Sequence, residues 1–400
     1  MKKKISFKSR EPINKSDKRF YAFDFNILSS KKLIQESSNC IKKYGFCIID
    51  NVIPSKLIKT IRQEIIDAQN ESSKNVKLIK QILEKNKKIS EKRLIKSKKI
   101  QLRSTGREGR ISKPPNDIIW MPKYAKQLAN EFIIDLAKNI LDQQVKIAHL
   151  HSRIIPVTDP KDESNILVRN DLLGLPRIDK GPADSRDWHT DWPHDPSAYG
   201  GKNPDENVGF IRSPFPDVVM CLVMIWYFND VDDKSGGTWV VPGSHKDKRN
   251  PRGPFDDITL TAPIPGETQI KAKSGSVFIQ DSRLWHSAPM NNYSQNKRVA
   301  VVNRWCPWWL ALNEYAPKSR FNNVCRPLSH NEYLKLPKKL KPLMRHLCPK
   351  EEDTIDKLML EYSNLASERT KWAYLQLKEN PYNLAHANDK IIVSKQKVKK

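Results

Sequence analysis

Hydrophobic residues near the start of the chain recur with the spacing of helices, interrupted by one short apolar run. The apolar positions within 29–43 predict a helix that Gly45 ends as a C-cap residue. The run 46–50 that follows predicts a strand. Pro54 then opens a second helix, whose apolar stripe consists of Leu57, Ile58, Ile61, Ile65 and Ile66.

The pattern changes from helical to strand-like in the middle of the chain. An amphipathic helix is predicted over 125–142, and beyond it short apolar runs alternate with loops rich in Pro, Gly and Asp. Helical spacing returns after Pro317, with a further helix predicted over 353–378. The clearest predicted strands are 144–150, 186–191, 217–228, 237–241, 275–280 and 298–305. These elements predict a mainly β fold with flanking helices.

The net charge of +26 is concentrated in three stretches of the 400 residues. Residues 1–19, 71–110 and 388–400 carry +6, +10 and +4, and the remainder of the chain is close to balanced. A basic surface can attract nucleic acid or an anionic membrane. Because the charge lies in tails and one Lys-rich segment, the sequence favours a solvated lysine surface over such a partner.

Several classes of protein are disfavoured by what the sequence lacks. The longest apolar run, 218–228, is too short for a membrane span, which needs about 20 residues. No apolar stretch follows the first lysines, so we expect no secretory signal. The six cysteines form no Cys-x-x-Cys pair and fit buried thiols in a reducing cytoplasm. The glycine fingerprints of dinucleotide and phosphate loops and the Gly-x-Ser-x-Gly elbow are also missing.

Two histidines and one aspartate occur in a pattern that fits a metal ion. His189 and Asp191 stand two residues apart, so on a strand both point to the same face. Another predicted strand delivers His286, and Arg298 follows twelve residues later. Two histidines and a carboxylate make the facial triad of non-haem Fe(II) oxygenases, which leaves three positions open. A 2-oxo acid can fill two of them, and an arginine fork suits its far carboxylate.

Other histidines fit this role less well. His245 and Asp247 also stand two apart, but they lie in a polar, turn-rich stretch where a rigid ligand pair is less plausible. His149 and His151 lie on an early predicted strand, where packing or substrate contact is the more typical role.

Four pieces of the sequence carry a family resemblance, and they occur in the family's order. They are 44–54, which predicts a strand and the start of a helix; Trp188-His-Thr-Asp191; Gly236 to His245, with the pattern Gly-Gly…Pro-Gly-Ser-His; and His286 with Arg298. Together they resemble the phytanoyl-CoA dioxygenase (PhyH) family of Fe(II)/2-oxoglutarate-dependent oxygenases. The likeness covers roughly 38–310.

The resemblance implies a double-stranded β-helix (jelly-roll, cupin-like) core with helices packed outside. It implies Fe(II) bound by His189, Asp191 and His286, 2-oxoglutarate anchored by Arg298, and O₂ as the oxidant. The implied reaction hydroxylates a small organic molecule and decarboxylates 2-oxoglutarate to succinate and CO₂. Related halogenases replace the carboxylate ligand with a small residue, so the presence of Asp191 favours hydroxylation over halogenation.

The sequence departs from some relatives near the two anchoring positions. Ala288 and Ala300 stand where those relatives place a serine. Thr190 and Ser287 are therefore further candidates for binding 2-oxoglutarate.

The substrate side of the site is predicted only in outline. Trp192 flanks the metal motif, Arg186 precedes it, and Trp239 belongs to a group of tryptophans in the β region. These three are candidates for a substrate pocket. The long loops 159–187 and 246–268 are candidates for lids, because long structured loops often shape active sites.

The expected organisation has one folded domain between basic tails. Its parts are a basic, disordered tail over 1–28; an oxygenase domain over 29–316, with a Lys-rich helical segment over 71–110 and a β-core over about 144–310; a helical extension over 317–386 packed on the core; and a basic tail over 387–400. We expect a cytoplasmic location. The substrate and the oligomeric state are left open by the sequence.

Two other functions remain alternatives. The first is a non-catalytic binding protein on the same fold, which would be expected to have lost at least one ligand position. The second is an oxygenase or binder directed to nucleic acid through the Lys-rich segments. It predicts an affinity that falls steeply with salt concentration.

Overall fold

The structure is a computed structural model. It describes residues 20–68, 70, 117–155, 157, 168–170, 176–178, 188–191, 193, 216–249, 251, 264–287, 292–310, 328 and 330–348. The Lys-rich segment 71–110 and the predicted helix 353–378 lie outside these residues. The predicted lid over 159–187 is described only at β4 (Val168–Asn170) and β5 (Pro176–Ile178).

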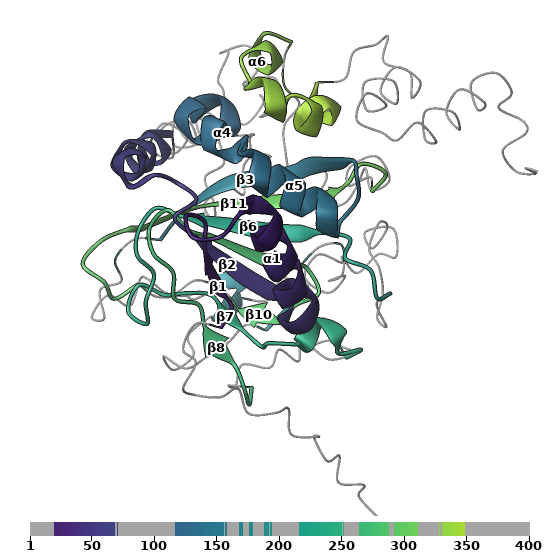
Figure 1. Ribbon diagram of the computed structural model, residues 1–400. Coiled ribbons are helices and arrows are strands. Elements are labelled where there is room, and N and C mark those ends of the chain that lie inside the picture. Colours follow the sequence, from purple (N-terminus) through teal and green to yellow (C-terminus); the bar gives the residue numbers. More distant parts are fainter. Residues whose placement is uncertain are drawn as a thin grey trace, which may run out of the picture.

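A six-stranded sheet forms the centre of the molecule (Figure 1). β1 and β2 run parallel, and all other neighbouring strands in it run antiparallel. Its order is β1 (Ala22–Asp24), β2 (Phe46–Asp50), β9 (Val277–Asp281), β6 (Leu222–Tyr227), β11 (Arg298–Pro307) and β3 (Val145–Ile155).

A smaller sheet completes the core. It consists of β10 (His286–Ser287), β7 (Trp239–Val240) and β8 (Thr268–Gln269), in that order. An isolated bridge between His189 and His286 adds the first metal motif beside β10. The two sheets form the double-stranded β-helix, or jelly-roll, core, so the predicted fold is confirmed.

Helices cover the outer face of the large sheet. Tyr124 in α4 (Pro122–Leu128) donates a hydrogen bond from its hydroxyl to Asn303 Oδ1 in β11, at 3.1 Å. Its ring also packs edge-on against Trp226 of β6. All three side chains are buried, and fully burying a large apolar side chain stabilises a fold by about 1.5–3 kcal/mol. Odd-numbered β11 residues therefore face the helices, and even-numbered ones face the jelly-roll interior.

One predicted helix is in fact two. The structure has α4 and then α5 (Glu131–Ile140) in place of a single helix over 125–142. The side chain of Asn130 accepts a hydrogen bond from the backbone N–H of Phe132 at 2.9 Å, and it thereby caps the start of α5. η2 (Asp117–Trp120), a short 3-10 helix, precedes α4.

The prediction that residues 1–28 form a disordered tail is wrong for the last part of this range. Residues 22–24 form β1, which pairs with β2, and Tyr21 is buried. A three-residue strand carries almost no sequence pattern, and its partner lies about 26 residues later, so local spacing could not reveal it. The large sheet thus also recruits strands from outside the predicted β-core of 144–310.

The predicted strand 186–191 is wrong in its described part, because residues 188–191 hold only the isolated bridge at His189. Other elements agree with the predictions but differ in their bounds. β6 begins later than the predicted strand 217–228, and β3 runs further than 144–150. α1 (Ser30–Tyr44) agrees with the predicted first helix, and residues 55–68 are helical as expected after Pro54. The C-terminal described part holds α6 (His330–Leu334), η6 (Lys338–Leu340) and η7 (Pro342–Leu347). No helix among the described residues has the length and apolar character that crossing a membrane requires.

Gly45 lies between α1 and β2 and packs against the loop that carries His286. It adopts φ 87°, and a Cβ there would meet His245 Nδ1 and Leu284 Cδ1, each at 2.7 Å. We expect Gly45→Ala to lower the free energy of unfolding by about 2–4 kcal/mol, because it adds a clash to the backbone penalty of about 1–2 kcal/mol. Urea denaturation would measure this loss.

Gly266 provides the matched control for this substitution. Its φ is 83°, and a Cβ there would meet nothing within 4 Å. Gly266→Ala should therefore show the backbone penalty alone. Equal losses in the two variants would mean that the junction with the His286 loop is not tightly packed.

His346 should make stability depend on pH. Both ring nitrogens are shielded and have no hydrogen-bond partner in the described part of the chain. Burial, aided by nearby Lys146, lowers the pKa of His346 to about 3. The unfolded chain takes up a proton near pH 6.5, but the folded state does not, so stability falls as the pH drops below that value. We expect a loss of about 1–2 kcal/mol between pH 7 and pH 5 from this group.

Urea denaturation at the two pH values would measure that loss. A His346→Phe variant should lose less stability on acidification than the unmodified chain, and His330→Gln on exposed α6 should lose as much. If all three proteins lose the same amount, His346 is accessible to protons in the folded state.

Candidate metal centre

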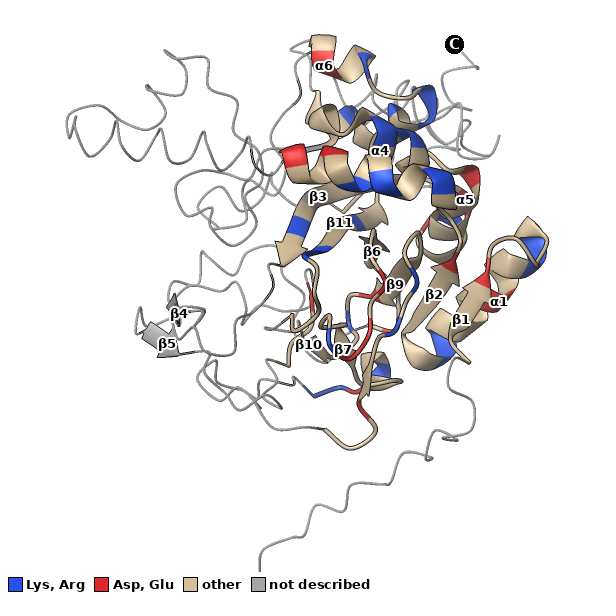
Figure 2. Cartoon of the chain, turned by 90° about the vertical axis from the view of Figure 1, so that its left-hand side faces the viewer, with Lys and Arg blue, Asp and Glu red and all other residues tan. Residues whose placement is uncertain are grey.

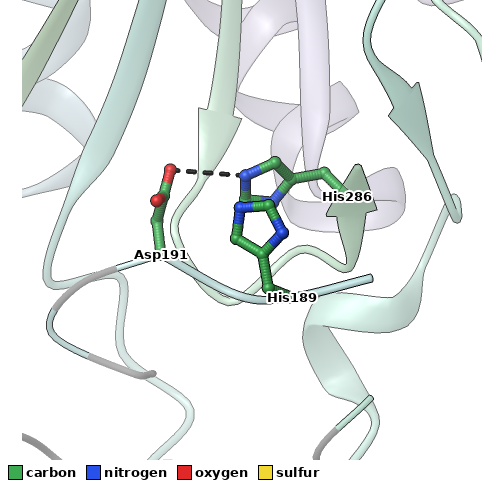
Figure 3. Close-up of side chains that lie close together, drawn as sticks. All are labelled: His189, Asp191 and His286. Carbon is green, nitrogen blue, oxygen red and sulfur yellow. Dashed lines mark ion pairs between the residues drawn. The ribbon is translucent and has the colours of Figure 1, made fainter. Parts of the chain in front are cut away.

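His189, Asp191 and His286 converge at one end of the jelly roll (Figure 3). One ligand atom from each lies within 4.8 Å of the others. Asp191 and His286 are buried, and His189 is partly exposed. The structure therefore places together the three residues that the sequence indicated as metal ligands.

Backbone hydrogen bonds fix the positions of these side chains. His189 and His286 exchange two N–H to carbonyl bonds of 3.0 Å, as paired residues of antiparallel strands do. The N–H of Asp191 donates to the carbonyl of Ser282 at 2.8 Å, within the turn that joins β9 to β10. The first metal motif is thereby held against the loop that delivers the second histidine.

His286 is oriented for metal binding by its own loop. Its Nδ1 lies 2.9 Å from the carbonyl of Leu284, and a carbonyl can only accept, so Nδ1 carries the proton. The other nitrogen, Nε2, then faces Asp191 Oδ2 at 3.4 Å. A carbonyl that fixes the tautomer in this way is typical of metal-binding histidines.

The Asp191 carboxyl is held in its ionised form. Burial alone would raise its pKa, but Arg304 and then the imidazoles of His286 and His189 more than offset this, so that the pKa lies well below its usual range. An ionised carboxylate and imidazole nitrogens are the donors that a ferrous ion accepts.

These donors fit a six-coordinate divalent ion. Neighbouring ligands of such an ion lie about 3 Å apart when each bond is about 2.1 Å long. The 3.4 Å between Asp191 Oδ2 and His286 Nε2 is close to that value.

The Gly-Gly…Pro-Gly-Ser-His stretch supports the loop before His286. The hydroxyl of Ser244, in η5 (Ser244–Lys246), accepts a hydrogen bond from the Trp285 N–H at 2.8 Å. Val241 N–H donates to the carbonyl of Trp285 at 3.0 Å. His245 does not belong to the metal group, since its Nε2 lies 3.2 Å from the carbonyl of Lys42 at the end of α1.

Arg298 is buried at the start of β11, on the face that turns into the jelly roll. Its Nε and Nη1 have no hydrogen-bond partner among the described residues. Burial lowers the pKa of its guanidinium to about 10. A buried cation with unused donors is costly unless an anion binds it, and a carboxylate would satisfy both donors.

The other predicted site residues are placed less directly. Thr190 and Ser287 are buried, and each follows a candidate ligand by one position on an extended segment, so each side chain points away from that ligand's face. Trp239 packs with Trp188 and Trp285 beside the centre. Trp192 and Arg186 lie outside the described residues, as do Ala288 and the greater part of both predicted lids.

Arg304 is a site residue that sequence reasoning missed. Its Nη2 donates to Asp191 Oδ1 at 2.7 Å, and its Nη1 lies 3.1 Å from His149 Nδ1. A signal for it existed, because the period of two along 298–305 puts Arg304 on the same face as Arg298. His149, which the sequence assigned to packing or substrate contact, is buried against Arg304.

The five cysteines that the structure describes are buried and free. Cys221 and Cys306 belong to a small apolar cluster together with Ala148, Val223 and Val302. Burial raises the pKa of Cys306 to about 12 and that of Cys221 well above its usual value. Both thiols are therefore protonated without a metal ion, and neither belongs to the group of described residues that could bind one.

A jelly roll with two histidines and one carboxylate converging at its end defines the class of non-haem iron oxygenases. The model of the phytanoyl-CoA dioxygenase (PhyH) family matches residues 41–300, and the chain belongs to this family. Membership confirms the expected cofactors, Fe(II), 2-oxoglutarate and O₂, and indicates an Fe(II)/2-oxoglutarate-dependent enzyme.

Solved structures give more distant likenesses. HygX from Streptomyces hygroscopicus with nickel and 2-oxoglutarate bound is 12% identical, with 69% of this chain and 87% of that chain covered and a TM-score of 0.40. The non-heme alpha ketoglutarate dependent epimerase SnoN from nogalamycin biosynthesis is 14% identical, with 69% and 84% covered and a TM-score of 0.37. No curated protein matches the chain.

Proposed function

We propose that the protein is an Fe(II)- and 2-oxoglutarate-dependent dioxygenase that hydroxylates a small organic molecule. The observation that carries this proposal is the convergence of His189, Asp191 and His286, with their ligand atoms within 4.8 Å of one another. Membership of the family supports the same chemistry. The substrate class follows from the resemblance, and we propose it together with a cytoplasmic location.

Each residue of the centre has a distinct role in this proposal. His189, Asp191 and His286 would hold Fe(II), and Arg298 would bind the far carboxylate of 2-oxoglutarate. When bound, the metal ion would activate O₂, the oxidant, and 2-oxoglutarate would supply two of the electrons that reduce it. Asp191 occupies the ligand position that a halogenase leaves open, which supports hydroxylation. Thr190 and Ser287 remain secondary candidates for binding 2-oxoglutarate, and Trp192, Arg186 and Trp239 for binding substrate.

The protein also shields its own centre. Asp191 and His286 are almost fully buried, and the backbone pair between His189 and His286 closes the small sheet on one side. Restricting water strengthens the electrostatic interactions of the bound carboxylates and suppresses side reactions.

We propose that the domain extends from about residue 20 to 316, followed by the helical extension over 317–386.

An anaerobic titration tests the proposal. Fe(II) and then 2-oxoglutarate would be added to the purified protein, and a visible charge-transfer band would be recorded. We expect a band that requires both additions. Succinate release with and without candidate small molecules would then identify substrates, with hydroxylated product measured by mass spectrometry. A protein that gives no band and retains no iron would favour the non-catalytic binding protein instead.

Nucleic acid is a weaker candidate partner. Among the described helices, α1 and α5 carry both lysine and acidic residues, and α4 carries only two lysines, so no long single-sign stripe runs along them (Figure 2). A phosphate-binding surface would gather cations of one sign along one face. Binding of single- and double-stranded oligonucleotides at two salt concentrations would decide the matter. Tight, steeply salt-dependent binding that weakens on deleting 1–19 and 388–400 would favour the nucleic-acid alternative.

A further inference from the structure

The two oxygens of Asp191 have different surroundings. Oδ2 faces His286 Nε2 at 3.4 Å, on the side where the two histidines converge. Oδ1 accepts a charge-assisted hydrogen bond from Arg304 Nη2 at 2.7 Å. The side chains of Arg304 and Asp191 are 12% and 7% exposed, so solvent screens this pair little. One oxygen of the carboxylate is therefore directed to the candidate metal position, and the other is directed to the arginine.

The number of protein oxygens on the metal ion matters for this chemistry. A carboxylate can bind a metal ion through one oxygen or through both. With one oxygen, the three residues occupy three of six positions and leave two for a 2-oxo acid and one for O₂. With both oxygens, Asp191 would take a fourth position and compete with 2-oxoglutarate. A group that occupies Oδ1 therefore favours the open arrangement.

The backbone holds Arg304 in place for this contact. The register of β11 on β3 shifts between Arg304 and Trp305, and Ala148 is the extra residue of β3. Bulges of this kind are common next to active sites, where they redirect a side chain. At the bulge, His149 lies beside Arg304, and because a guanidinium only donates, His149 Nδ1 is the acceptor. Arg304 is thus held from both sides.

We propose that Arg304 is a positioning residue that keeps Asp191 a one-oxygen ligand, and so reserves the open metal positions for 2-oxoglutarate and O₂. The proposal rests on the proposed function, because it requires a metal ion at this site. Arg304 lies just beyond the end of the family match at residue 300, and neither the sequence motifs nor that match assigns it a role. It also adds a second cation to the face of β11 that carries Arg298.

The test separates metal affinity from 2-oxoglutarate affinity. Full-length protein, Arg304→Met and Arg304→Lys would each be titrated anaerobically with Co(II) alone, and the Fe(II)-loaded proteins with 2-oxoglutarate. We expect Arg304→Met to bind Co(II) as tightly as the unmodified protein or more tightly. The 2-oxoglutarate concentration that gives half of the charge-transfer band should rise at least about tenfold. Arg304→Lys keeps the charge and one donor. The 2-oxoglutarate concentration that it requires should therefore lie between those of the unmodified protein and Arg304→Met.

The controls distinguish this role from a structural one. Arg345 is more deeply buried than Arg304, but it lies in η7 and bonds to the carbonyl of Cys348, so Arg345→Met should change neither affinity. Thermal melting would confirm that each variant is folded. Arg304→Met losing both affinities by the same factor, or neither, would overturn the proposal. Failure of the unmodified protein to bind Co(II), or unchanged binding by His286→Ala, would instead overturn the proposed function.

Discussion

Replacing His286 with alanine should abolish metal binding at the centre and all 2-oxoglutarate turnover that depends on Fe(II). The variant leaves His189 and Asp191 as two ligands on one short segment, which cannot define the facial arrangement. We expect the metal affinity to fall by more than about a hundredfold, because one of the three ligands itself is removed. Equilibrium dialysis with Fe(II) under argon and succinate release in air would measure the two effects.

His245 supplies the control for this prediction. It belongs to the second His-x-Asp pair of the sequence, but in the structure it bonds to the end of α1. His245→Gln should therefore retain the metal ion, even if it lowers stability by disturbing the contact with Lys42. If His245→Gln lost the metal and His286→Ala kept it, the ligand assignment would be wrong.

Replacing Arg298 with methionine should have two opposite effects. The 2-oxoglutarate concentration needed for half-maximal turnover should rise at least about a hundredfold, because a desolvated charge-assisted bond to the far carboxylate is lost. The free energy of unfolding without ligand should rise by about 1–3 kcal/mol, because a buried cation with unused donors is replaced by an apolar side chain of similar length.

Two measurements on the same variants check this prediction. Succinate release against 2-oxoglutarate concentration gives the first effect, and urea denaturation without ligand gives the second. Lys31→Met, at an exposed position of α1, serves as the control and should leave both values near those of the unmodified protein. An Arg298 variant that is less stable and binds 2-oxoglutarate normally would show that Arg298 is a structural residue.

The ligand set could be predicted from the sequence because it depends on local rules. The spacing of His189 and Asp191 on an extended segment puts both on one face, whatever surrounds them. His286 was identifiable because an apolar strand delivers it. The jelly-roll class followed from the family resemblance, and short strands between turn-rich loops agree with it.

The contacts around the ligands could not be predicted in the same way. Arg304 reaches Asp191 only in the register that β11 adopts against β3, with one bulge, and no local pattern specifies that register. β1 was missed because its partner is remote. The split between α4 and α5 was missed because the apolar pattern runs on through 125–142 and does not show the cap that Asn130 provides.

The pairing of β2 with β9 has a consequence for the order in which the protein matures. The paired residues, from Phe46–Gln280 to Ile49–Val277, are separated by more than 220 positions, and the N–H of Asp281 bonds to Gly45 beside them. Contacts between such distant positions form late in folding, because a long loop must close first. The turn that carries His286 can therefore adopt its folded conformation only after both β2 and β9 have been synthesised and have paired. We therefore expect the centre to bind iron only after the domain has folded, and not while the chain is still being synthesised.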